Sequence, residues 1–115
     1  MSDTPIEPEA AFHLLLDREE VPVCASALRL LISDEAHQPQ IRGLAREVLA
    51  ALDAPADEHG VTTVPLTPEQ MKITHTAVRL LFKDLQRGQA DELSTLRAIL
   101  AKLPDEHTMR AIVLD

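Results

Sequence analysis

The sequence predicts a mainly helical α+β domain, and three observations lead to that prediction. The octamer ALRLLISD at 27–34 returns as AVRLLFKD at 77–84. Apolar residues after each helix-start signal recur at the spacing of amphipathic helices. Three short runs rich in branched apolar residues, at 11–16, 61–66 and 109–114, have the composition of β-strands. An all-α fold is the alternative, because the first of these runs follows Pro8 and acidic residues that also suit a helix start.

The internal repeat extends well beyond the octamer. Residues 16–34 align without a gap over residues 66–84, and seven of the nineteen positions are identical. One inserted residue later, REVLAAL at 46–52 aligns with RAILAKL at 97–103. Each unit has an apolar face that it cannot bury alone, so the two units should pack on each other. The sequence therefore predicts one domain, 1–115, of two tandem units at about 11–55 and 61–104 with pseudo-twofold symmetry.

The second unit carries the signals of a helix pair. Thr67 and Gln70 have the spacing of a capping box, with Pro68 in the first turn, and an apolar stripe follows them. A second helix is expected over 90–103, where Pro104 ends it.

The first unit repeats this plan with different residues. Asp17 and Glu20 replace the threonine and glutamine of the capping box. Pro22 lies past the first turn if Asp17 is the cap, so the helix either starts later or is kinked. Pro39 opens a second helix that is expected to end near Asp53.

The apolar runs and the helix pairs give the order β-αα-β-αα-β. Helical connections between strands favour parallel pairing with right-handed crossovers. Pro65 lacks a backbone N–H, so the middle run is expected at a sheet edge or outside the ladder. The run at 109–114 is expected to form a short C-terminal strand.

Composition and charge exclude several classes of protein. The chain of 115 residues has a net charge of −8, all of it in residues 1–58, while residues 59–115 are neutral. Non-specific nucleic-acid binders need a positive footprint, so nucleic acid is not expected as the main partner. No apolar run approaches the length of a membrane span. A lone cysteine, Cys24, fits the reducing cytoplasm.

The sequence contains no motif that predicts catalysis, a metal site or a cofactor. Three glycines do not provide a phosphate-binding loop, and no Ser/His/Asp arrangement is present. Cys24 lies on the packing stripe, so we expect a buried small residue and not a nucleophile. Acidic residues stand beside a histidine at 34–37, 57–59 and 105–107, but their spacing is not that of a zinc site. We expect these clusters to lie in loops.

One helix face predicts an interaction surface. Lys72, His75, Arg79 and Lys83 follow one another at i, i+3, i+7 and i+11, opposite the apolar face, so His75 is expected to be exposed. The first unit has small or apolar residues at most of these places, namely Pro22, Ala25, Arg29 and Ser33.

The two units therefore differ on the outer faces of their helices while their apolar faces are alike. Together with the absence of catalytic motifs, this difference predicts a non-enzymatic interaction or regulatory module that acts through helix faces, and we expect it in the cytoplasm. Its partner is another protein or a second copy of the chain, as in a homodimer. The alternative is a DNA-binding regulator that uses the Lys72–Lys83 stripe. A small metal-binding protein or enzyme is the third hypothesis.

Overall fold

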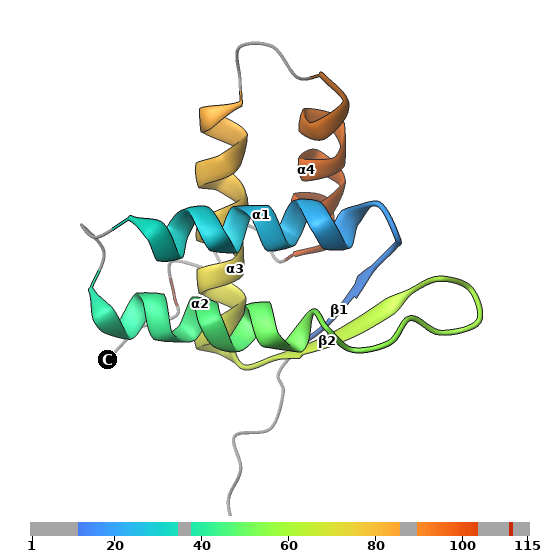
Figure 1. Cartoon of the computed structure of the whole chain (residues 1–115), viewed down its shortest axis with the longest axis horizontal. Helices are drawn as coiled ribbons and strands as arrows, with labels where there is room; N and C mark the ends of the chain where they lie inside the picture. The colour runs from blue at the N-terminus through green and yellow to red at the C-terminus, as the bar shows by residue number, and fades with distance from the viewer. Residues whose placement is uncertain (1–11, 35–37, 86–89, 104–110, 112–115) are drawn as a thin grey trace, which may run out of the picture.

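The structure is a computed structural model that describes residues 12–34, 38–85, 90–103 and 111 (Figure 1). The fold is α+β and mainly α, as the sequence predicts. None of the described helices is long and apolar enough to cross a membrane. The described elements, in chain order, are β1 (Phe12–Leu16), α1 (Glu20–Ser33), α2 (Pro39–Ala51), β2 (Thr62–Leu66), α3 (Pro68–Asp84) and α4 (Ala90–Lys102).

β1 and β2 form a two-stranded antiparallel sheet in which Leu14 lies opposite Val64 at the centre. The parallel pairing expected from the sequence is wrong, because two helices and not one connect the strands. α1 and α2 run side by side in opposite directions, so the chain enters β2 against the direction of β1 (Figure 1). Pro65 lies opposite His13 in an edge strand, as expected. The C-terminal strand expected at 109–114 falls outside the described residues, except for residue 111, which is helical.

Reciprocal hydrogen bonds form at both predicted capping boxes. Thr67 Oγ1 accepts from the Gln70 N–H at 3.2 Å, and Gln70 Oε1 accepts from the Thr67 N–H at 3.0 Å. Asp17 and Glu20 make the same pair of bonds at 2.9 and 2.8 Å. α1 itself begins at Glu20, so Pro22 lies in the first turn, where a missing N–H is tolerated.

The core lies between the inner face of the sheet and the four helices. The strands alternate as amphipathic strands should, with Leu14 and Leu16 buried and His13 and Leu15 exposed. α1 and α3 cross at the centre, α1 also contacts α4, and α3 also contacts α2 (Figure 1). Side chains with no exposed surface come from both halves of the chain: Leu16, Cys24, Ala27, Leu28, Leu31, Ala45, Val64, Leu66, Thr74, Ala77, Val78, Leu96 and Ile99.

A buried carboxylate fastens the end of α4 to the start of α1. The side chain of Glu20 is only 5% exposed, and the Lys102 ammonium donates a hydrogen bond to it. The same ammonium donates to the Leu15 carbonyl oxygen at 3.0 Å. Lys102 of α4 therefore contacts both the Glu20 side chain of α1 and the Leu15 carbonyl of β1.

Candidate functional site

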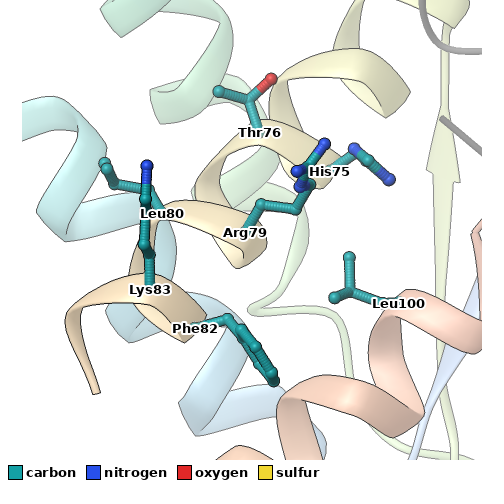
Figure 2. Close-up of a pocket in the computed structure, with 7 residues that line it drawn as sticks. All are labelled: His75, Thr76, Arg79, Leu80, Phe82, Lys83 and Leu100. Carbon is teal, nitrogen blue, oxygen red and sulfur yellow. The ribbon is translucent and has the colours of Figure 1, made fainter. Parts of the chain in front are cut away.

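A groove of about 560 Å³ lies between α3 and α4, and we call it the α3–α4 groove. Figure 2 shows that His75, Arg79 and Phe82 project from successive turns of α3 and that Leu100 comes from α4. The described residues that line it are His75, Thr76, Arg79, Leu80, Phe82, Lys83 and Leu100.

Local sequence explains why these side chains meet. The capping box at Thr67 sets where α3 begins, and residues three or four apart then lie on one face of the helix. α4 is held against the core by Leu96 and Ile99, which have no exposed surface. Leu100 follows them by one residue, so it lies at the edge of the packed face, half-buried, and borders the groove.

The groove is lined mainly by apolar and positively charged side chains, and we call Arg79 and Lys83 its positive rim. Of the described residues that line it, none is acidic, and Arg79 and Lys83 are exposed. The guanidinium carbon of Arg97 lies 5.5 Å from the centre of the Phe82 ring, within the range of a cation–π contact. Arg97 does not line the groove itself, but it adds a third positive charge beside it.

The structure brings together three of the four residues of the predicted surface. His75, Arg79 and Lys83 line the α3–α4 groove, whereas half-buried Lys72 is not among its lining residues. His75 is only 8% exposed, so the expectation that it faces solvent is wrong. The reason is that α1, α2 and α4 all contact α3, so burial extends around this helix beyond its apolar stripe.

The apolar half of the site was not predicted as a site. Leu80, Phe82 and Leu100 follow the spacing of core residues, and the sequence assigns them to the packed faces. All three are only partly buried against the core. Their partial exposure depends on how α3 and α4 pack against each other, and the spacing of residues within one helix does not predict that packing.

Cys24 is a buried core residue, as the sequence predicts. Its side chain has no exposed surface. Burial, and secondly the negative charge of Glu20, raise the pKa of its thiol to about 12. A nucleophilic cysteine needs the opposite shift, because the thiolate is the reactive form.

The raised thiol pKa predicts a measurable pH dependence of stability. The pKa of Cys24 is about 12 in the folded chain against an ordinary value of 9.0, so the unfolded thiol ionises first. This contribution to stability is complete below pH 9 and is lost as the pH rises toward 12. Urea unfolding at pH 7 and pH 10 should therefore show a loss about 1 kcal/mol larger for wild type than for Cys24→Ala. An equal loss in both proteins would contradict the assignment.

The acid–histidine cluster at 57–59 builds a turn. Asp57 Oδ1 accepts hydrogen bonds from the His59 and Val61 backbone N–H groups at 2.8 and 2.9 Å. Gly60 has a φ of 78°, which favours glycine at this position before β2.

The two other acid–histidine clusters, at 34–37 and 105–107, lie partly or wholly outside the described residues. Across the described ranges, no group of three or more His, Cys, Asp or Glu side chains is placed to hold a metal ion.

The chain matches no protein-family model, and no curated protein or solved structure is significantly similar to it.

Proposed function

We propose that this protein is a non-enzymatic, cytoplasmic interaction module that binds an acidic amphipathic segment of a partner protein in the α3–α4 groove. One observation carries the proposal: the apolar side chains of Leu80, Phe82 and Leu100 lie beside the exposed cations Arg79 and Lys83. An amphipathic helix binds such a groove through its apolar side chains, which contact the apolar lining residues. Its carboxylates then meet the positive rim.

The dimensions suit a short helical segment. Residues 75–83 of α3 extend over about 12 Å, because each helical residue adds roughly 1.5 Å. That length matches about two turns of a partner helix. Burial of the partner's apolar side chains would supply affinity, and the charge pairs would set its orientation.

The charge of the chain favours an acidic partner at this place. The whole chain carries −8, so a groove whose described lining is cationic and apolar is a local exception. An acidic segment is therefore attracted to this groove although the chain as a whole is acidic. Residues 1–58, which also carry −8, have a suitable charge, so a homodimer is one outcome of the test below.

We further propose that the fold consists of two duplicated units related by an approximate twofold axis through the Leu14–Val64 pair. The strand register supports it: Phe12 pairs with Leu66 and Leu16 with Thr62, and a shift of 50 residues with a twofold rotation exchanges these pairs. Burial supports it as well, since residues at aligned positions are buried together. These aligned pairs are Leu16 and Leu66, Cys24 and Thr74, Ala27 and Ala77, Leu28 and Val78, Val48 and Ile99, and Leu52 and Leu103.

The alternative functions have less support. A DNA-binding regulator would use the Lys72–Lys83 stripe, but His75 is buried and the net charge of −8 repels phosphate. A metal-binding protein or small enzyme has no supporting group of ligands among the described residues.

The test uses a fluorescent amphipathic peptide of roughly 14 residues, about four helical turns, with Leu at helical spacing and Glu between them. We expect the full chain to bind it with a Kd of roughly 10–100 μM, the range of a weak specific contact. The same peptide with Lys in place of Glu should bind at least about tenfold more weakly. The variant Arg79→Glu/Lys83→Glu should weaken binding of the acidic peptide about 30-fold, since it turns two attractions into repulsions.

The matched control is Arg18→Glu/Lys72→Glu, which changes the net charge equally outside the groove. It should change the affinity by less than about threefold, because neither side chain lines the groove and exposed charges are screened at physiological salt. Equal loss in both variants, or equal binding of the Lys peptide, would overturn the proposal. Duplex DNA bound with a steep salt dependence would favour the regulator instead. Light scattering at high concentration reports the homodimer, and a dimer that Arg79→Glu/Lys83→Glu dissociates would make a second copy the occupant.

A further inference from the structure

A second groove, of about 510 Å³, lies between α1 and α2, and we call it the α1–α2 groove. Arg29 comes from α1, while Arg46 and Leu49 come from α2. Its described lining residues are Val21, Pro22, Ala25, Arg29, Arg46, Leu49, Ala50, Leu52 and Asp53.

The two grooves occupy equivalent places in the two halves of the chain. Arg29 aligns with Arg79 at a shift of 50 residues, and Leu49 aligns with Leu100 at a shift of 51. Arg29 and Leu49 line the α1–α2 groove, and their aligned residues Arg79 and Leu100 line the α3–α4 groove. The equivalence therefore covers both walls of the grooves, because each groove takes its arginine from the first helix of a unit and its leucine from the second.

The positive charge is also retained. Arg46 lines the α1–α2 groove, and its aligned residue Arg97 stacks on Phe82 beside the α3–α4 groove. Arg29 and Arg46 are exposed, and within the part of the chain that the structure describes neither forms an ion pair. Asp53 is the one acid among the described lining residues, against two arginines.

We infer that the α1–α2 groove is a second binding site of the same class, so that one molecule holds two acidic amphipathic segments. The inference rests on the proposed function for the nature of the ligand. The occupant follows from charge complementarity: Arg29 and Arg46 line this groove together with Leu49 and other apolar side chains, as Arg79 and Lys83 line the α3–α4 groove together with Leu100.

The two sites differ in their detailed preference. Ala25 stands where the other groove has His75, so the α1–α2 groove has no titratable side chain at that position. Asp53 lowers its positive charge, so we expect it to be the weaker site for the same peptide. Two sites on one molecule favour a partner that presents two acidic segments, because the second segment then binds at a high effective concentration.

Backbone amide NMR of the full chain, titrated with the acidic peptide described above, locates each site. We expect perturbed signals in two clusters, around Arg79 and Leu100 and around Arg29 and Leu49. Arg29→Glu/Arg46→Glu should remove the second cluster and leave the first. Arg79→Glu/Lys83→Glu should do the reverse. Arg18→Glu/Lys72→Glu, which carries the same change in net charge, should retain both clusters.

A tandem probe tests the bivalency directly. Two copies of the peptide joined by a flexible linker of roughly 40 residues, which spans about 35 Å, should bind wild type at least about tenfold more tightly than one copy. Either groove variant should lose that gain. Perturbation of the α3–α4 cluster alone, with no gain for the tandem probe, would overturn this inference and leave the proposed function standing. Perturbation of neither cluster would overturn both.

Discussion

Replacing Leu28 by Ala is expected to lower the free energy of unfolding by about 4 kcal/mol. Leu28 has no exposed surface and lies in α1, the helix that contacts α2, α3 and α4. Packing on three sides leaves the surrounding structure little freedom to collapse into the cavity, so the cost should fall in the upper part of the usual range. Urea unfolding followed by circular dichroism measures it.

Two further variants keep this prediction testable if Leu28→Ala does not fold. Leu28→Val introduces the side chain that α3 carries at the aligned position 78, and we expect a loss of about 1.5 kcal/mol. Leu15→Ala removes a side chain that is 51% exposed, so it should cost less than about 1 kcal/mol. Equal losses for Leu28→Val and Leu15→Ala would contradict the complete burial of Leu28 in the packed core.

Replacing Glu20 by Ala is expected to cost about 3 kcal/mol. The variant loses the bond to the Asp17 N–H, a capping interaction of about 1 kcal/mol. It also leaves the Lys102 ammonium without its carboxylate at the junction of α4 and β1. Because the side chain of Lys102 is 39% exposed, water replaces part of that interaction, and we assign it about 2 kcal/mol and not more.

The two parts of this cost can be separated. Glu20→Gln retains an oxygen for the Asp17 N–H, as Gln70 does for Thr67, but removes the charge. It should therefore lose about 2 kcal/mol by urea unfolding, close to the share of the ion pair. Glu19→Ala, at an exposed neighbour, should change stability by less than about 0.5 kcal/mol. If Glu20→Ala behaves like Glu19→Ala, the link between α4 and α1 does not contribute to stability.

Most of the helical content could be predicted from the sequence, since local interactions determine it. The capping residues at Thr67 and Asp17 act within one turn, and Pro39 opens α2 because its fixed φ suits a helix start. The alternation of buried and exposed side chains in β1 follows from the pleat of a single strand. Burial of Cys24 likewise follows from its place on an apolar stripe.

Only the tertiary structure decided how elements far apart in the chain lie relative to one another. The antiparallel pairing of β1 with β2 depends on the path of the two helices between them. A single connecting helix would return the chain to a parallel strand, whereas a second helix reverses its direction again. The burial of His75 depends on how many helices surround α3.

The grooves are the clearest case of this division. The sequence determined that Arg79 and Lys83 lie on one helix face, because the 3.6-residue period places them there. Only packing set α4 beside α3 so that Leu100 joined them and Lys72 did not. Periodicity within a helix is a short-range property, whereas the space between two helices depends on side chains supplied by both.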